Sequence, residues 1–150
     1  MTIRTANGDA LTRLILEIFR INGELLGAGN TLTSPFGLTC ARWQMLGAID
    51  EEGRSLTVSQ IARRMGLARQ GVQRLAKDLE KLGLIRASPN IDHKRAPLFS
   101  LSEEGKKTME KINVVQVNWV NQLAKGLAEN QVAEADAILK LVRERSENLN

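Results

Sequence analysis

Two short amphipathic segments separated by a glycine constrain the fold of this chain more than any other feature. The first, "TVSQIARRMG" (57–66), has apolar residues at helical spacing, and Thr57 or Ser59 is a suitable N-cap. The second, "RQGVQRLAKDLEKLG" (69–83), is longer, more basic and ends at Gly83. Two such helices joined by a tight turn predict a helix-turn-helix, with an ordinary helical hairpin as the alternative. The inward residues are Ile61, Ala62, Met65, Val72, Leu75, Leu79 and Leu82.

The segment that follows predicts a β-hairpin. Two short extended runs, "LIRAS" and "PLFSLS", flank the charged stretch "NIDHKRAP" (90–97), and Phe99 and Leu101 alternate with Ser100. A hairpin directly after a helix-turn-helix is the arrangement of a winged helix. We therefore expect a wing at about residues 84–101.

Helical patterns stand on both sides of this predicted lobe. One runs from Asp9, a plausible N-cap, to about Gly27, and "GAGNTLTSPFG" (27–37) has the composition of a loop. Another starts at Thr39 and stops at Gly53. A long helix capped by Ser102 and a last helix follow, with a break near residues 126–130. The first helix is apolar on more than one side, so a second subunit is a natural partner for it.

Positive charge is concentrated in the middle of the chain. Residues 54–97 hold ten Lys or Arg and three acids, a net charge of +7, whereas the whole chain of 150 residues carries +4. This imbalance favours a surface for a polyanion, although solvated helix faces are the alternative. Cys40 is the only cysteine, which excludes an intramolecular disulfide and suits the cytoplasm. We expect a cytoplasmic protein, because no stretch has the length and apolarity of a signal sequence or a membrane span.

Both in the order of its predicted helices and strands and in its residues, the chain resembles the multiple-antibiotic-resistance regulator (MarR) family of bacterial transcription factors. The resemblance rests on "LT…W.ML..I", "TVSQIARRMGL", "VQRLAKDLEKLGLI" and "RAPLFSLSEEG". It implies a mainly α fold in one domain over 1–150, with a winged-helix DNA-binding lobe at 38–101. It also implies a homodimer held by helices at about 9–30 and 102–148. Most members are repressors that grip a palindromic operator, and many are released by a small ligand or by oxidation.

The chain departs from the family pattern at three places. Ala68 stands where serine often caps the recognition helix, and Gly71 stands in its first turn, where threonine is common. The wing aspartate of the family falls on His93, one place after Asp92. In the family that acid holds the wing arginine, here Arg95. We therefore predict Asp92 as the residue that orients the wing.

The second helix of the helix-turn-helix presents one polar face opposite its apolar one. Arginine pairs with guanine O6 and N7, and glutamine pairs with adenine N6 and N7, in the major groove. Gln70, Gln73 and Arg74 are therefore predicted to contact bases, and Arg69 and Lys77 phosphates. The alternative is a solvated polar face.

The wing and the preceding helix add further candidates. Lys94 and Arg95 are expected to reach a minor groove or its phosphates, with His93 as an additional donor. Ser59 and Gln60, at the start of the preceding helix, are weaker candidates for phosphate contacts. A metal site is not expected, because a lone histidine without nearby cysteines supplies too few ligands.

Alternatives to a ligand-released repressor remain open at this stage. A winged helix can also bind proteins without binding DNA. Cys40, at the start of a helix, is either an oxidant sensor with a lowered pKa or a small buried hydrophobe. Enzymatic activity is not expected, because no nucleophile–base pair or phosphate-binding loop is present. We expect no cofactor, and no effector-binding residue is assigned.

Overall fold

A computed structural model describes residues 2–150 of the chain, which form six α-helices, a short 3-10 helix and a two-stranded sheet. A first compact unit reaches Val115, and Gln116–Asn150 form a second. Helix α5 passes from the first unit into the second. In chain order the elements are α1 (Ala6–Thr33), η1 (Ser34–Phe36), α2 (Cys40–Glu52), α3 (Val58–Met65), α4 (Arg69–Lys81), β1 (Ile85–Ser88), β2 (Leu98–Leu101), α5 (Glu103–Leu123) and α6 (Glu129–Leu149).

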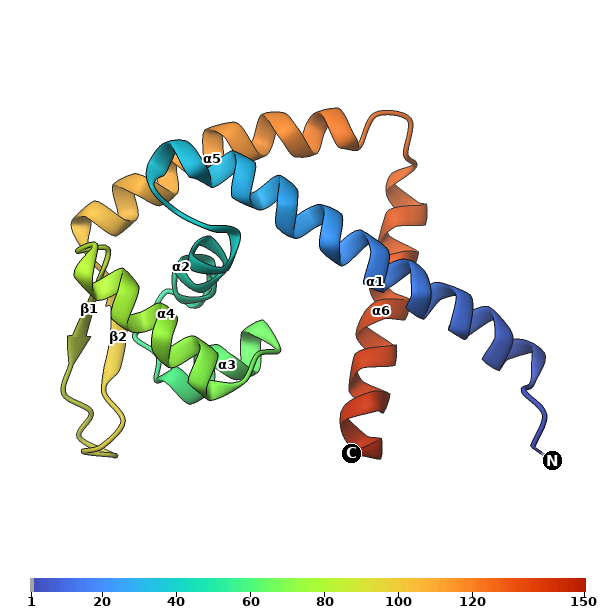
Figure 1. The fold of residues 1–150 in the computed structure, drawn as a ribbon, viewed down its shortest axis with the longest axis horizontal. Coiled ribbons are helices and arrows are strands. Elements are labelled where there is room, and N and C mark those ends of the chain that lie inside the picture. Colours follow the sequence, from blue (N-terminus) through green and yellow to red (C-terminus); the bar gives the residue numbers. More distant parts are fainter. Residues whose placement is uncertain (1) are drawn as a thin grey trace. The chain divides into compact units, whose positions relative to one another are not determined.

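The hydrophobic core of the first unit lies between α2, α3, α4 and the hairpin (Figure 1). The inward residues expected from the sequence are buried or pack against this core, except Leu82, which follows the last residue of α4 and is 48% exposed. Leu56 forms an isolated bridge with Phe99: the Phe99 N–H donates to the Leu56 carbonyl at 2.7 Å, and the Leu56 N–H donates back at 2.9 Å. The residue between α2 and α3 therefore extends the sheet, and Phe99 fixes the hairpin to the helix-turn-helix. The completely buried core residues are Met45, Leu46, Leu56, Ile61, Val72, Ala76, Leu79 and Ile112.

The helix boundaries of the lobe follow the local signals in the sequence. Thr39 caps α2 through a bond from the Arg42 N–H, and Thr57 forms a capping box with Gln60 at the start of α3. Ser102 accepts from the Gly105 N–H at the start of α5. The prediction of a winged helix-turn-helix in a mainly α fold is confirmed. Left-handed glycines follow the ends of these helices, with φ values of 66° at Gly53, 66° at Gly66 and 73° at Gly83.

The first helix is longer than the sequence pattern predicted. It begins after the cap Thr5, not Asp9, and it continues to Thr33 through residues that were expected to form a loop. The reason is tertiary. Gly29 lies directly against Cys40 of α2, and the Cys40 N–H donates to Asn30 Oδ1 at 2.8 Å. The buried hydroxyl of Thr33 bonds to the carbonyl oxygens of Gly29 and Leu38.

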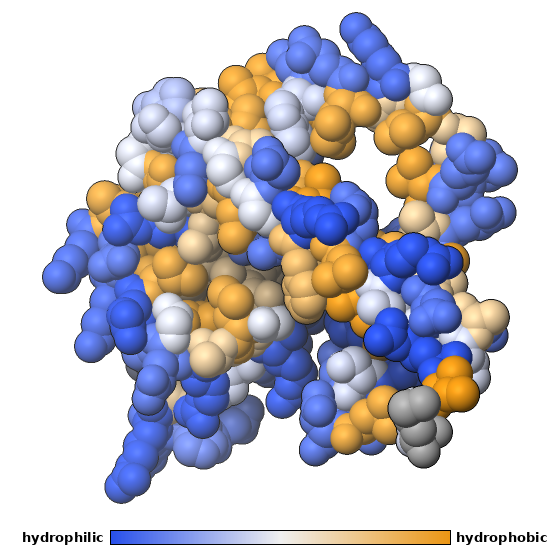
Figure 2. Space-filling view, turned by 45° about the vertical axis from the view of Figure 1, so that its right-hand side comes forward, coloured by the Kyte–Doolittle hydropathy of each residue, from blue (hydrophilic) through white to orange (hydrophobic). Residues whose placement is uncertain are grey.

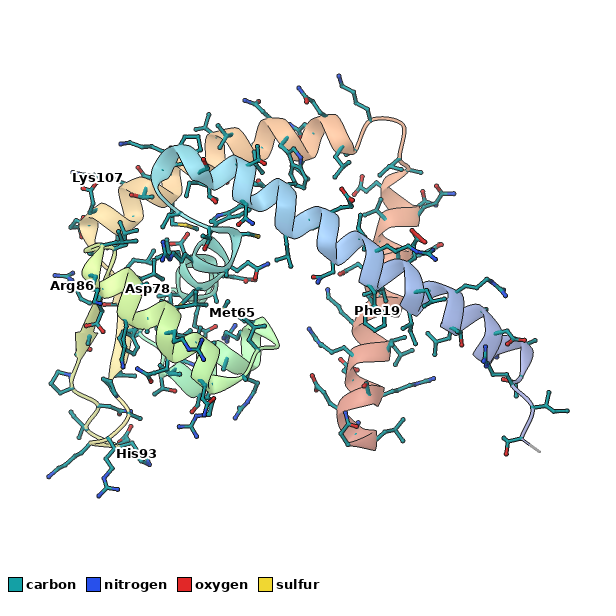
Figure 3. The ribbon with its side chains drawn as sticks, in the orientation of Figure 1. Phe19, Met65, Asp78, Arg86, His93 and Lys107 are labelled. Atoms are coloured by element: carbon teal, nitrogen blue, oxygen red, sulfur yellow. The ribbon has the colours of Figure 1, made fainter. Side chains whose placement is uncertain are left out.

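Strands β1 and β2 are antiparallel, with Ile85 opposite Leu101 and Ser88 opposite Leu98. The strand bounds confirm the predicted hairpin at 84–101. Figure 1 shows this hairpin projecting from the lobe beside α4, and Figure 3 places His93 at its tip. The wing therefore extends the surface of the lobe next to the second helix of the helix-turn-helix.

The second unit consists of the end of α5, a turn with Gly126 at φ 80°, and α6. None of its residues, all of which the structure describes, is buried. Large aliphatic side chains therefore remain on its surface, as they do along α1, and Figure 2 shows hydrophobic residues beside polar ones on the outside of the molecule. Within residues 2–150, the helices are all too short or too polar to cross a membrane.

Candidate nucleic-acid interface

Helix α4 separates a buried apolar face from an exposed polar one. Val72, Ala76 and Leu79 are buried against the core. Gln70, Arg74 and Lys77 point away from these three, because a helix repeats every 3.6 residues. Gln73 lies to the side of the buried face, and Arg69 lies at its edge. All five are exposed: Arg69, Gln70, Gln73, Arg74 and Lys77.

The positive side chains on this side of the lobe are free of acidic partners. Some arginines elsewhere have an acidic partner: Arg64 and Arg54 both pair with Glu52, the second at 2.8 Å. By contrast, among residues 2–150 no acid lies within 4 Å of the five cations proposed for DNA contact. Their charge is therefore available to an external anion. These cations are Arg69, Arg74, Lys77, Lys94 and Arg95.

A shallow hollow lies where α3 begins and the first turns of α4 pass it. It has a volume of about 380 Å³ and is lined by Val58, Arg69, Gln70 and Gln73. Two amides and a guanidinium thus surround one aliphatic side chain, a combination that suits the edges of base pairs and the methyl group of thymine. Val58 lines this hollow but was not predicted from the sequence, because an apolar residue at helical spacing is expected to pack in the core.

Ion pairs hold the helices that present this surface. Arg42 Nη2 of α2 lies 3.3 Å from Asp78 Oδ2 of α4, and both side chains are partly exposed. Asp78 is marked on α4 in Figure 3. Glu52 at the end of α2 pairs with Arg64 of α3. Partly exposed pairs of this kind contribute little stability, about 0–1 kcal/mol each. Their geometric effect is to tie α3 and α4 to α2.

Asn90 organises the tip of the wing. Its side-chain amide donates to the Ala96 carbonyl at 3.0 Å, and its Oδ1 accepts from the Asp92 N–H at 3.2 Å. Its own carbonyl accepts from the His93 N–H at 3.3 Å. The turn is therefore closed by one side chain that joins its two ends. The preference of asparagine for such turns was the available signal in the sequence.

Comparisons with known proteins agree with this geometry. A model of the MarR family matches residues 36–96, which include α2, α3, α4 and most of the wing. Protein Rv2011c of Mycobacterium tuberculosis is 40% identical over 116 residues, which cover 77% of this chain and 80% of that protein. The chain belongs to the MarR family.

Two solved structures show that the similarity extends to the fold. AbsC, a MarR family transcriptional regulator from Streptomyces coelicolor, has a TM-score of 0.79 at 24% identity, and the match covers 99% of each chain. A mutant of MarR from Escherichia coli, crystallised with operator DNA, has a TM-score of 0.77 at 23% identity. That match covers 89% of this chain and 96% of the other. MarR family proteins are transcriptional regulators, which agrees with the expectation that the chain is not an enzyme.

The wing differs from the arrangement that the MarR resemblance implied. His93, Lys94 and Arg95 are exposed at the tip, as expected. Asp92, however, makes no ion pair with Arg95 in the part of the chain that the structure describes, and its backbone N–H bonds to Asn90. The expected contact between Asp92 and Arg95 is therefore absent from the free chain, and the orienting role of Asp92 stays a prediction.

The residues predicted at the starts of α3 and α4 differ in whether the structure already gives them a partner. Ser59 is half-buried in the first turn of α3, where its phosphate contact stays a prediction. Gln60 is already engaged, because its Oε1 accepts from the Thr57 N–H at 2.9 Å. Ala68 supplies no side-chain cap to α4, as its substitution for serine implied. The first N–H groups of α4 thus have no side-chain partner from Ala68.

The environment of Cys40 contradicts a lowered thiol pKa. The side chain is 5% exposed and lies against Gly29, and burial raises the pKa of the thiol. The cause is desolvation, which disfavours the charged thiolate. The thiol therefore has the character of a small buried hydrophobe. Within residues 2–150, no three side chains of the metal-binding types are grouped.

Proposed function

We propose that this MarR family protein is a homodimeric transcriptional repressor that binds a palindromic DNA operator. The observation that carries the proposal is the exposed face of α4, whose arginines and lysine lack acidic partners while its opposite face is buried. An unneutralised cationic face beside two glutamines suits phosphates and base edges together. A protein-binding surface more often has aromatic or aliphatic anchors at its centre.

The roles of the α4 residues follow from their order along the helix. The N-terminal half of a recognition helix enters the major groove most deeply. Gln70, Gln73 and Arg74 therefore contact bases, and Arg69 and Lys77 contact phosphates on either side. In the same complex Ser59 donates to a phosphate at the start of α3.

The wing contributes a second, less sequence-dependent contact. Lys94 and Arg95 stand at the end of a hairpin whose turn is fixed by Asn90. Arginine and lysine side chains are attracted to narrow A·T-rich minor grooves, where the negative potential is strongest. His93 adds a further hydrogen-bond donor. The wing then holds the lobe in register beside the major groove.

A second copy of the chain is the proposed partner of the exposed apolar residues. On α1, Phe19 is 69% exposed, and Leu16, Ile21 and Leu25 are exposed as well. On α6, Val132, Ile138, Leu139 and Leu141 are exposed. Covering such surfaces stabilises an assembly by about 25 cal/mol per Å². The related MarR of Escherichia coli was crystallised with operator DNA, and a symmetric dimer places two lobes on half-sites about 10 base pairs apart.

Repression then results from occupation of a promoter. Small-ligand release, common in the family, is the proposed mode of regulation: a ligand that prefers a dimer with differently spaced lobes lowers operator affinity. No residue is assigned to that ligand.

Selection of genomic DNA fragments tests this proposal. The protein is incubated with a genomic library at about 50 and 200 mM salt, and retained fragments are sequenced. We expect one enriched palindromic motif, and light scattering should give twice the chain mass of 16.6 kDa. Retention without sequence preference at both salt concentrations, or no retention, would favour the alternative of a protein-interaction module.

Variants then test the individual roles on the selected operator. Gln73→Ala should relax preference at one base position, at a cost of about 1–3 kcal/mol for the preferred base. Arg95→Ala should weaken binding to all sequences and reduce the salt dependence. Arg4→Ala, which removes an exposed charge paired with Asp9, is the control and should leave affinity unchanged. Uniform effects of both test variants on every sequence would refute the assignment of Gln73.

A further inference from the structure

Some glycines in this chain are required by the backbone or by close packing, whereas Gly71, like Gly23 and Gly27 of α1, is required by neither. Gly53, Gly66 and Gly83 adopt the left-handed backbone that follows a helix. At Gly105 an added Cβ would collide with the carbonyl oxygen of Leu84, so close packing excludes a side chain there. Gly71 is not among the residues with positive φ, and an added Cβ would meet no atom within 4 Å.

The folded chain is therefore less stable with glycine at this position than with alanine. Gly71 is the third residue of α4 and is exposed. Glycine is the least helix-favouring residue after proline, since its backbone loses the most freedom on folding. No turn and no contact inside the protein compensates for that loss. The folded chain alone therefore gives no reason for glycine at residue 71.

Gly71 differs from Gly23 and Gly27 in its neighbours, which are residues suited to an external partner. Gln70 precedes it, and Arg74 lies one helical turn further on, on the adjoining surface of α4. Both are exposed, and the first turn contains no acid. The side chain that is missing would project beside the two residues assigned to base contacts. DNA is the partner to which these neighbours are suited.

We propose that Gly71 is a specificity-determining residue, because the missing side chain lets α4 lie deeper in the major groove. The inference rests on the DNA binding proposed above and deepens it. With a methyl group or more at residue 71, the helix stands further from the DNA, and Gln70 and Arg74 lose their reach to base edges. Hydrogen bonds weaken steeply with added distance and poorer angles, so a small displacement matters.

Two measurements on Gly71→Ala test the inference. We expect the variant to be more stable than the wild type but to bind the operator less tightly. The melting temperature should rise by about 2 °C, because alanine favours the helix and strains nothing. The Kd for the operator selected from genomic fragments should rise about tenfold, with little change for a scrambled duplex of equal length. Gly71→Leu should raise the operator Kd further, by about a hundredfold, while the far-ultraviolet circular dichroism stays that of the native chain.

Gly47→Ala is the matched control. Gly47 lies in α2 of the same lobe, and an added Cβ would make an ordinary contact with Met109 Cε at 4.0 Å. This variant should gain thermal stability without a change in operator affinity. The inference is overturned if Gly71→Ala binds the operator as tightly as the wild type or more tightly. It is also overturned if the variant loses equal affinity for the operator and the scrambled duplex, or if its melting temperature falls. If the wild-type chain itself retains no DNA, that result contradicts the proposed function, and not only the role of Gly71.

Discussion

The winged-helix lobe and the C-terminal segment Gln116–Asn150 differ in how completely they bury their apolar residues. In the lobe, Leu46, Leu56 and Ile61 are fully buried around Phe99. In Gln116–Asn150, all of it described by the structure, no residue is buried, and Ile138 is 51% exposed. A segment with aliphatic residues and no core of its own needs another surface to cover it. In the proposed function, the lobe contacts DNA and the segment pairs with a second copy of the chain.

The largest expected effect tests the lobe core. Phe99→Ala should lower the free energy of unfolding by about 3–5 kcal/mol, because it removes a buried ring and leaves a cavity. Urea unfolding followed by circular dichroism measures the change. Ile91→Ala, at a side chain that is 96% exposed, should stay within about 0.5 kcal/mol of the wild type. Equal effects of the two substitutions would mean that the lobe core does not support the fold.

The second prediction concerns the exposed aliphatic residues of α6. Leu139→Glu should weaken the proposed dimer by about 2–3 kcal/mol, because a charge replaces an apolar side chain that the partner would cover. Light scattering over a dilution series gives the dissociation constant. Ser146→Glu, at an exposed polar position of the same helix, is the control. A dimer that tolerates Leu139→Glu would show that this part of α6 is not covered.

The third prediction compares the starts of two helices. Thr57 caps α3 with its side chain, whereas Ala128 gives α6 no side-chain cap. Thr57→Ala should cost about 1 kcal/mol of unfolding free energy, and Ala128→Ser should gain about 0.5 kcal/mol. Thermal and urea unfolding measure both. If Thr57→Ala is neutral, the capping box adds nothing beyond the packing of α3.

The smallest effect appears at alkaline pH and involves Cys40. Burial raises the pKa of this thiol in the folded chain, so the unfolded chain loses the proton first. The resulting stabilisation is fully present below the ordinary thiol pKa of about 8.5 and is lost as pH rises through the higher folded value. Cys40→Ala removes this dependence. Urea midpoints of both proteins between about pH 7 and 10 should therefore converge as pH rises; a constant difference would argue against the raised pKa.

Most of the lobe could be predicted from the sequence because its signals are local. Thr39 and Gly53 bound one helix, and Ser102 starts another, through contacts with residues three or four positions away. Apolar spacing in α3 and α4 identified the buried face in the same way. The exposed residues of α4 follow directly, since a helix with one buried face presents its opposite face to solvent.

The errors occur where distant residues decide the local structure. The stretch 27–33 has the composition of a loop, but it is helical because Gly29 fits against Cys40 and Asn30 accepts from the Cys40 N–H. For Cys40 the helix start left two alternatives open, and only the structure, which buries the thiol, decides for the small hydrophobe.

The sequence by itself determined the order of helices and strands, the winged-helix lobe and the residues that α4 exposes, because periodicity and caps act within a few residues of one another. Only the tertiary structure decided how far α1 extends, that Asp92 makes no ion pair with Arg95 in the described residues, and that a side chain added at Gly71 would meet no atom of the folded chain. These features depend on contacts, or on their absence, between residues brought together by folding, and no local pattern records them.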